Sequence, residues 1–202
     1  MSVTSWISVV LLAAGRGSRF GGASNKLLAD FDGRPLVRRA AEAALASRAR
    51  DTIVVTGHGR PEIEAALAGL PLSFAHNPDF ASGLASSLRK GLAAAAAADA
   101  VIVLLADMPG VSSGLIDGLI FAFEKAPEAP AIVPVQGGRR GNPALLAKSL
   151  FPRLMALEGD EGAKRLLSEL DGVIELPVDE DVLNDVDVPS DLDRLRGQIR
   201  RS

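Results

Sequence analysis

The sequence has no cysteine, only two histidines and a formal net charge of −3 over 202 residues. Because cysteine is missing, disulfides, thiolate metal sites, iron–sulfur clusters and cysteine nucleophiles are all excluded. The histidines, His58 and His76, form no triad-like or H-x-x-x-H arrangement, so we assign neither of them a catalytic role. A net charge this close to zero argues against a general nucleic-acid binder and against a protein of anionic membrane surfaces.

Long apolar runs are also missing from the sequence. No run reaches the ~18 residues that a membrane span requires. The N-terminus has no basic segment before its first apolar run, and a glycine-rich loop follows that run where a signal peptide would have its cleavage site. We therefore expect a soluble protein of the cytoplasm that binds no membrane, and we interpret residues 7–14 as a first strand.

Short β-branched segments alternate along the chain with longer segments rich in alanine, leucine and arginine. This alternation is typical of βαβ units on a parallel sheet. We predict an α/β fold in three layers, a mostly parallel central sheet with helices on both faces, as a single domain over residues 1–202. The expected strands are 7–14, 51–57, 72–77, 100–109, 131–135, 172–177 and 182–189, and the expected helices are 35–47, 60–70, 82–98, 112–126, two short pieces within 151–170, and 189–200.

A glycine-rich loop follows the first expected strand, in the sequence VVLLAAGRGSRFGGASNKLL of residues 9–28. It contains Gly15 and Gly17, and a backbone rich in glycine can present its N–H groups to an anion. Three cations, Arg16, Arg19 and Lys26, occur in the same loop. The loop is long enough to wrap a triphosphate, although a glycine-rich turn after a strand also needs no ligand to explain it.

Two better-known phosphate loops do not fit this sequence. A dinucleotide-binding G-x-G-x-x-G loop would need a glycine where Phe20 occurs, and an acidic residue at the end of the next strand, which instead ends VVTG. The string G-x-x-x-x-G-K-[ST] of the P-loop does not occur in the loop either. The loop therefore indicates a long basic nucleotide-phosphate site or a plain turn.

Acidic residues follow two of the later strands, at the sheet edge where open α/β sheets bind their ligands. Asp107 comes after the apolar run VIVLLA, and a carboxylate there suits Mg²⁺ as well as it suits a strand end or a helix cap. Asp185 and Asp187 alternate in NDVDVP, so an extended strand would point both to one face. Both could equally be solvated.

Basic and small polar residues mark two further segments. Arg139 and Arg140 occur between glycines in GRRGNP, where a planar guanidinium suits a phosphate group, although an exposed turn would suit the pair equally well. Ser86 and Ser87 occur near the start of an expected helix, where capping accounts for one serine without any ligand. Asp160 in GDEGAKR begins another expected helix and has the same alternative as an N-cap.

Six segments together resemble the MobA-like nucleotidyltransferases. The loop LLAAGRGSRFGGASNKLL is similar to the signature L-A-A-G-x-G-x-R-x-G…K of that family. The segments NPDFASGLASSLRKGL, LLADMPGV, GRRGNPALL, LFPRLMALEGDEGAKRLL and DVDVPSDLDRL resemble its molybdenum-cofactor cytidylyltransferase branch, in the expected order over nearly the whole chain. The sequence departs from the pattern at Phe20, where methionine is usual, and at Ala106, where glycine is common.

The resemblance implies a Rossmann-like, GT-A-like nucleotidyltransferase fold, with a nucleotide-binding half over about 1–110 and an acceptor-binding half over about 111–196. It also implies roles for individual residues. Catalytic roles fall to Arg19, Lys26 and Asp107; nucleotide binding to Leu12, Ala13, Ala14, Gly15, Arg16, Gly17, Lys26, Gly83, Ser86 and Ser87; acceptor binding to Arg139, Arg140, Gly141, Asn142 and Asp160; and metal binding to Asp107 and Asp187, with Asp185 in reserve.

The activity that the resemblance implies is Mg²⁺-dependent transfer of CMP from CTP to the phosphate of molybdopterin, with release of pyrophosphate. A molybdoenzyme or its maturation factor would be the protein partner, and no nucleic acid is involved. Three alternatives stay open: the same chemistry with GTP or with another phosphorylated acceptor such as a sugar phosphate, an NAD(P)H-dependent oxidoreductase, and a non-catalytic chaperone that delivers the cofactor.

Overall fold

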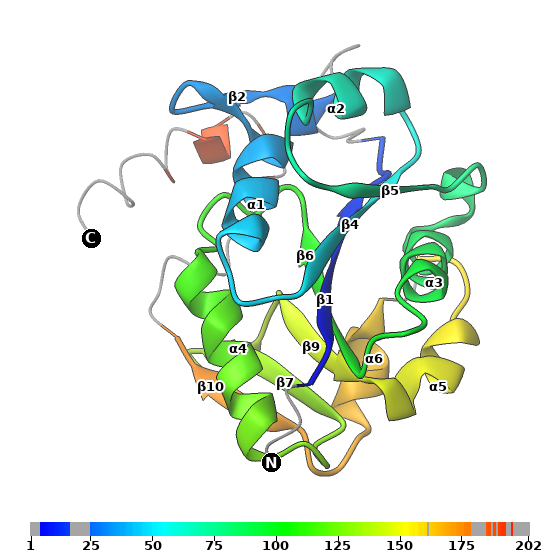
Figure 1. Ribbon diagram of the computed structural model, residues 1–202, viewed down its shortest axis with the longest axis vertical. Helices are drawn as coiled ribbons and strands as arrows, with labels where there is room; N and C mark the ends of the chain where they lie inside the picture. Colours follow the sequence, from blue (N-terminus) through cyan, green and yellow to red (C-terminus); the bar gives the residue numbers. More distant parts are fainter. Residues whose placement is uncertain are drawn as a thin grey trace.

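Strand β1 (Ile7–Ala13) is buried at every position and lies inside the main sheet, between β4 and β6. It pairs in parallel with both neighbours, which explains why the sequence there is almost continuously apolar rather than alternating. The computed structural model describes residues 5–16, 25–160, 162–178, 185–186, 188, 190–192 and 195. Within these residues the sheet lies between two layers of helices, and Figure 1 views the sheet from its edge.

The main sheet has the strand order β10-β7-β9-β6-β1-β4-β5, with β8 paired to β7, and a small second sheet joins β2 to β3. Most neighbours are parallel, whereas β9 runs antiparallel to both β6 and β7. The remaining strands are β2 (Asp30–Phe31), β3 (Arg34–Pro35), β4 (Asp51–Thr56), β5 (Ser73–His76), β6 (Ala100–Leu105), β7 (Ala131–Gln136), β8 (Arg139–Arg140), β9 (Ala144–Ala147) and β10 (Ile174–Pro177).

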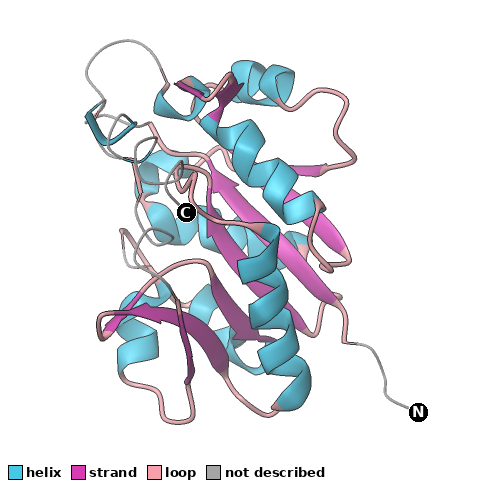
Figure 2. Cartoon of the chain, turned by 90° about the vertical axis from the view of Figure 1, so that its left-hand side faces the viewer, coloured by secondary structure: helices cyan, strands magenta, loops and turns pink. Residues whose placement is uncertain are grey.

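One face of the sheet is covered by α1, α2 and α4, and the other by α3, α5 and α6. Figure 2 looks onto the sheet from the side of α1 and α4. The helices are α1 (Leu36–Leu45), α2 (Arg60–Ala66), α3 (Leu84–Ala94), α4 (Ser113–Lys125), α5 (Phe151–Met155) and α6 (Ala163–Ser168), and short 3-10 turns occur at η2 (Lys26–Leu28), η3 (Phe80–Ser82) and η4 (Lys148–Leu150). No helix among the described residues is long and apolar enough to cross a membrane.

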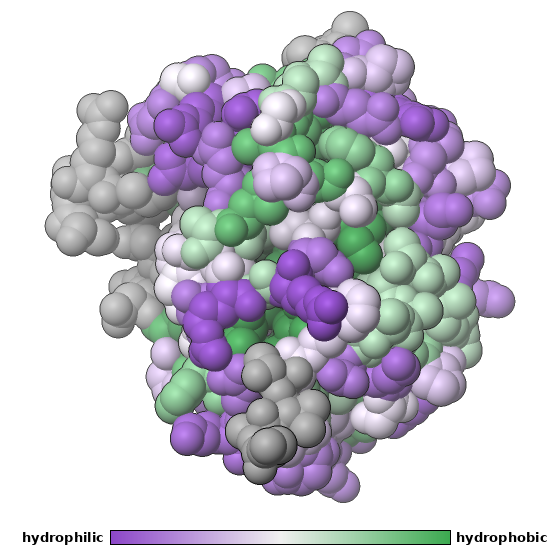
Figure 3. All heavy atoms as spheres, viewed as in Figure 1, coloured by the Kyte–Doolittle hydropathy of each residue, from purple (hydrophilic) through white to green (hydrophobic). Residues whose placement is uncertain are grey.

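Helix α3 packs directly on the central strand because it presents a glycine there. A Cβ atom at Gly91 would lie 2.2 Å from the Cγ1 atom of Val10, which no side chain could tolerate without a shift of the helix. At the alanine-rich end of α3 and in the turn after it, Ala93, Ala94, Ala96 and Ala97 are exposed, whereas Ala95 and Ala98 are buried. The pale green surface on the right of Figure 3 lies over this part of the molecule. This close packing sets the start of α3 beside the carboxyl end of β1.

The predicted three-layer, mostly parallel fold is confirmed, with differences at several segments. The strand expected over 100–109 ends at Leu105, and the helix expected over 82–98 covers only Leu84–Ala94. After the strand expected over 131–135, the structure contains the antiparallel strands β8 and β9, which were not among the expected strands. Most of the strand and helix expected over 182–200 lies outside the described residues, and Asp185 and Val186 are not in a strand.

Candidate active site

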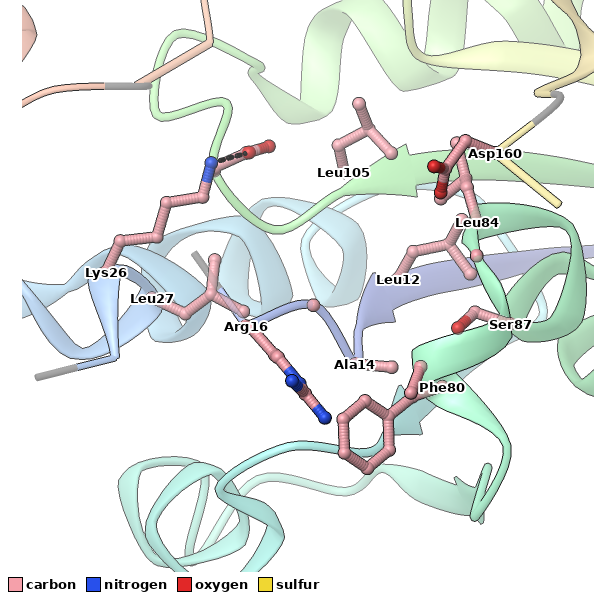
Figure 4. A pocket seen from close by; sticks show the side chains of 14 residues that line it. Leu12, Ala14, Arg16, Lys26, Leu27, Phe80, Leu84, Ser87, Leu105 and Asp160 are labelled. Carbon is pink, nitrogen blue, oxygen red and sulfur yellow. Dashed lines mark ion pairs between the residues drawn. The ribbon is translucent and has the colours of Figure 1, made fainter. Parts of the chain in front are cut away.

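A cavity of about 460 Å³, called the first cavity below, opens at the carboxyl ends of β1 and β6 (Figure 4). This is the edge at which open α/β sheets bind ligands. Residues from four distant parts of the sequence meet there: the end of β1, the 3-10 turn η2, the start of α3 and the segment after β6. Of the residues predicted from the sequence, the first cavity is lined by Leu12, Ala14, Gly15, Arg16, Lys26, Gly83, Ser87, Asp107 and Asp160.

Lys26 and Asp107 form an ion pair at one end of this cavity. The Nζ atom of Lys26 lies 2.7 Å from Oδ2 of Asp107, and the dashed line from Lys26 in Figure 4 marks the pair. The same ammonium donates to the backbone oxygen of Val186 at 3.1 Å, and the N–H of Val186 donates to the backbone oxygen of Asp107 at 2.9 Å. The backbone of Val186 therefore contacts both charged residues.

Local hydrogen bonds hold the backbone segments that carry Lys26 and Asp107. Asn25 caps the turn η2 by accepting a hydrogen bond from the N–H of Leu27 at 3.1 Å, so Lys26 starts a defined turn rather than an open loop. The segment after β6 is held from α1, because the guanidinium of Arg39 donates to the backbone oxygen of Pro109 at 3.0 Å. Both charges are thus presented by segments with fixed backbones.

Asp107 has one oxygen without a partner. Its Oδ1 atom is buried and accepts no hydrogen bond from the described residues, while Oδ2 is engaged by Lys26. A buried carboxylate oxygen without a donor fits a hard cation such as Mg²⁺, which is commonly held by one or two carboxylates together with phosphate oxygens. Among the described residues, no cluster of three or more acidic or histidine side chains surrounds a common point.

An aromatic side chain that the sequence did not single out lines the opposite side of the cavity. The guanidinium carbon of Arg16 lies 5.5 Å from the ring centroid of Phe80, and the ring of His58 meets Phe80 edge-on with centroids 6.0 Å apart. Figure 4 shows Phe80 beside Ala14, with Arg16 reaching across to it. Phe80 occurs in the segment NPDFASG, and its apolar ring offers a surface for a flat group.

The start of α3 is joined to the loop that carries Asp160. Gly83 has a φ of +108°, and a Cβ atom there would lie 2.2 Å from the backbone oxygen of Gly159. The N–H of Ala85 donates to that same oxygen at 3.0 Å. The close approach that Gly83 permits is therefore to the chain itself, and the contact brings Asp160 to the rim of the first cavity.

A second cavity of about 510 Å³ lies between the sheet, α3 and α6. It shares Leu12, Leu84 and Leu105 with the first cavity, so the two are adjacent. Its remaining walls are mainly apolar side chains of β6, β7, β9, α3 and α6. The predicted acceptor residues Arg140, Gly141 and Asn142 line this cavity rather than the first.

Arg140 is held in place at this second cavity by two contacts. Its Nε atom pairs with Oε1 of Glu175 at 2.8 Å, and Nη1 donates to the backbone oxygen of Leu167 at 2.6 Å. Arg139, by contrast, is exposed and lines neither cavity. The two arginines of GRRGNP therefore have different environments, and only Arg140 faces a cavity.

Other predicted residues are placed elsewhere. Ala13 is fully buried on the opposite face of the sheet, and Ser86 is buried with its hydroxyl bonded to neighbouring backbone oxygens, so neither lines the first cavity. Asp185 is exposed. Gly17, Arg19 and Asp187 lie outside the described residues.

Comparison with known proteins identifies the family of this chain. The sequence pattern of the MobA-like NTP transferase domain matches residues 9–173. The chain is 30% identical to the nicotine blue oxidoreductase of Paenarthrobacter nicotinovorans, covering 94% of this chain and 96% of that protein. It is 32% identical to the purine catabolism protein PucB of Bacillus subtilis, covering 93% and 94%.

A solved structure adds a metal to the comparison. The complex of Rv0371c from Mycobacterium tuberculosis with manganese superposes with a TM-score of 0.81 at 26% sequence identity. The match covers 96% of this chain and 99% of that one. Three-dimensional similarity therefore extends over nearly the whole molecule, and a relative with this fold binds a divalent cation.

Proposed function

The chain belongs to the MobA-like NTP transferase family and is a nucleotidyltransferase, and from that premise we propose that it transfers CMP from CTP to the phosphate of molybdopterin, releasing pyrophosphate. The observation that carries the proposal is the arrangement of Lys26 and Asp107 at the carboxyl ends of the strands. An ammonium and a carboxylate with one unsatisfied oxygen face the same cavity. The ammonium suits phosphates, and the carboxylate suits the divalent cation that accompanies them.

The reaction needs little from the protein beyond position and charge. An oxygen of the acceptor phosphate, already ionised at neutral pH, attacks the α-phosphorus of the nucleotide. A new P–O bond forms, the bond from the α-phosphorus to the bridging oxygen breaks, and pyrophosphate leaves with that electron pair. No general base is required, so catalysis consists of alignment and neutralisation of charge.

The residues divide this work between them. Lys26 stabilises the leaving pyrophosphate, together with Arg19 and the loop amides around Gly15. Asp107 and Asp187 would hold Mg²⁺, which supplies positive charge to the reacting phosphates. The manganese complex of the relative supports a divalent cation in this family.

The ion pair has a specific part in this scheme. Without nucleotide, Lys26 and Asp107 neutralise each other at 2.7 Å, so neither charge is left uncompensated in a site that is mostly shielded from solvent. A nucleotide–metal complex offers both residues a new partner, since the ammonium can pair with phosphate while the carboxylate pairs with the cation. Binding then replaces this ion pair by one between the ammonium and phosphate and one between the carboxylate and the cation.

The second cavity is the place we propose for the acceptor. Nine of its fifteen lining residues are apolar, and Arg140, Asn142, Lys164 and Ser168 supply polar side chains. A flat ring system can lie against the apolar walls, with its polar edge toward Asn142 and Ser168 and its phosphate toward Arg140 and Lys164. This lining supports an acceptor that has both a ring system and an anionic group, such as molybdopterin.

A nucleotide panel tests the proposal. The protein is incubated with Mg²⁺ and each of CTP, GTP, ATP and UTP, and binding is followed by thermal shift. Pyrophosphate release is then measured on addition of molybdopterin or a sugar phosphate. We expect the largest shift with CTP and release only with molybdopterin; an equal response to all four nucleotides would contradict the cytidine assignment, and a dominant response to GTP would replace it by guanylyl transfer.

One relative favours a second candidate function. The nicotine blue oxidoreductase aligns over nearly the whole chain, which makes an NAD(P)H-dependent oxidoreductase the strongest rival. Against it, β4 ends at Thr56 followed by Gly57, so the acidic residue that usually holds a nicotinamide ribose is missing at that strand end. Tight NADPH binding that survives excess CTP, with oxidation of the cofactor by a coloured acceptor, would establish the rival.

A further inference from the structure

We propose that Asn77 is a positioning residue, which fixes the hydroxyl of Ser87 as a hydrogen-bond donor toward the nucleobase. The Ser87 proton then meets an acceptor on the base edge, a carbonyl oxygen or an unprotonated ring nitrogen. The inference rests on the proposed function, because it takes the first cavity as the nucleotide site. It adds a residue whose role neither the sequence pattern nor the cavity lining reveals.

The orientation of the Asn77 amide is fixed by its neighbours. Asn77 follows β5 and is only 3% exposed. Its Oδ1 atom accepts the backbone N–H of Asp79 at 3.0 Å, and because only the amide oxygen can accept, the Nδ2 group must occupy the other position. That group lies 2.9 Å from Oγ of Ser86 and 3.1 Å from Oγ of Ser87. Both of its hydrogens are donated, one to each serine.

The two serines use their own protons differently. Ser86 has backbone carbonyl oxygens within reach, that of Gly83 at 2.8 Å and that of Asp79 at 3.0 Å, so its hydroxyl is satisfied inside the protein. Ser87 accepts from Asn77, and within the described ranges of the chain no acceptor takes its proton. Ser87 lines the first cavity, and Figure 4 shows its oxygen directed into that cavity. An O–H donor is thus presented to whatever binds there.

The surroundings of Ser87 indicate which part of a nucleotide it meets. The Lys26–Asp107 ion pair lies at one end of the cavity, whereas Leu12, Ala14 and Phe80 lie near Ser87, with Arg16 against the Phe80 ring (Figure 4). Phosphates belong at the charged end and a flat ring at the apolar end. Asn77 occupies one lone pair of Ser87 Oγ, so a base edge with an acceptor there can take the hydroxyl proton without competing with Asn77 for the oxygen.

A double-mutant cycle tests the coupling. Asn77→Asp replaces the donating amide by an acceptor of the same shape, so the Ser87 hydroxyl turns inward and no longer donates to the cavity. We expect Asn77→Asp and Ser87→Ala each to weaken CTP–Mg²⁺ binding about three- to tenfold by calorimetry, with kcat changed less than about twofold, and the double variant to bind no more weakly than either single one. Ser82→Ala, in the same segment but outside the cavity lining, is the matched control and should bind CTP normally.

A second measurement does not depend on the Asn77 variant folding. CTP is compared with 2-thio-CTP, 3-deaza-CTP and 2′-deoxy-CTP on the unchanged protein and on Ser87→Ala. We expect one of the two base analogues to bind about three- to tenfold more weakly than CTP to the unchanged protein, and as tightly as CTP to Ser87→Ala. Additive losses in the cycle, or a loss that follows the 2′-deoxy analogue instead, would overturn the inference, whereas a protein that binds no nucleotide at all would overturn the proposed function itself.

Discussion

The ammonium nitrogen of Lys26 lies 2.7 Å from Oδ2 of Asp107, across the carboxyl ends of the central strands. One residue comes from the glycine-rich loop after β1 and the other from the segment after β6, so only the folded sheet brings them together. In this ion pair the two side chains neutralise each other, and a nucleotide with its cation can offer each of them a new partner. Predictions about catalysis follow from which of the two charges is removed.

Removal of the lysine charge should abolish transfer while leaving the fold intact. In Lys26→Met the leaving pyrophosphate loses a positive charge, so we expect kcat/KM to fall at least about a hundredfold. The pair is largely shielded from solvent, so Lys26→Met also leaves the Asp107 carboxylate without this partner, and we expect Tm to fall by about 5–10 °C. Pyrophosphate release and thermal unfolding measure the two effects. Lys90→Met, on the exposed side of α3, is the control and should keep both values.

Removal of the carboxylate charge should act on the metal. Asp107→Asn keeps the shape of the side chain but replaces the buried Oδ1 and Oδ2 pair by a neutral amide, so the affinity for Mn²⁺ in the presence of CTP should fall at least about tenfold. Electron paramagnetic resonance of free Mn²⁺ gives that affinity directly. Asp171→Asn, in an exposed turn, serves as the reference. Unchanged Mn²⁺ affinity in Asp107→Asn would remove Asp107 from the metal site.

The two cavities should respond separately to substitution. Ala163 begins α6 and lines the second cavity but not the first, so Ala163→Leu fills acceptor space without touching nucleotide space. We expect the KM for molybdopterin to rise at least about tenfold, and the Kd for CTP to stay within about twofold. Steady-state kinetics and calorimetry measure these values, with the exposed Ala65→Leu of α2 as control. A higher Kd for CTP with an unchanged KM for molybdopterin would reverse the assignment of the cavities.

The junction between α3 and the Asp160 loop should be intolerant of any side chain at Gly83. A Cβ there would overlap the backbone of Gly159, and its φ of +108° is unfavourable for every residue with a side chain. We expect Gly83→Ala to lower the free energy of unfolding by about 1–3 kcal/mol, measured by urea titration. Gly114→Ala in α4 meets only Ser112 Oγ at 3.7 Å and should be neutral or slightly stabilising. Equal stability of both variants would show that the junction opens without cost.

Much of the fold is predictable because each buried parallel strand is an apolar run of its own. The segments that form β1 and β6 are apolar along nearly their whole length, and the polar residues that follow them, Lys26 and Asp107 among them, could be assigned to the sheet edge. Strand β9 was not predicted from the sequence, because only four apolar residues form it and because tertiary contacts determine its antiparallel pairing. Its place between β6 and β7 could not be read from local pattern.

The site was less predictable than the fold, for a physical reason. Residue type indicates what a side chain can do, but not which of its atoms are already engaged. Ser86 and Ser87 are identical in sequence terms, and only the hydrogen bonds from Asn77 and to nearby carbonyls distinguish the satisfied hydroxyl from the available one. In the same way, Arg140 differs from Arg139 through its contacts with Glu175 and with the backbone oxygen of Leu167.

The most direct test of nucleotidyl transfer follows the α-phosphate of CTP. The protein is mixed with Mg²⁺, molybdopterin and CTP labelled at the α-phosphorus, and the products are separated and identified by mass. We predict that the label appears in a cytosine dinucleotide form of the acceptor, one pyrophosphate is released for each label transferred, and Asp107→Asn transfers none. Label that stays in CTP, while NADPH is oxidised in a parallel reaction with a coloured acceptor, would contradict nucleotidyl transfer as the function of this site.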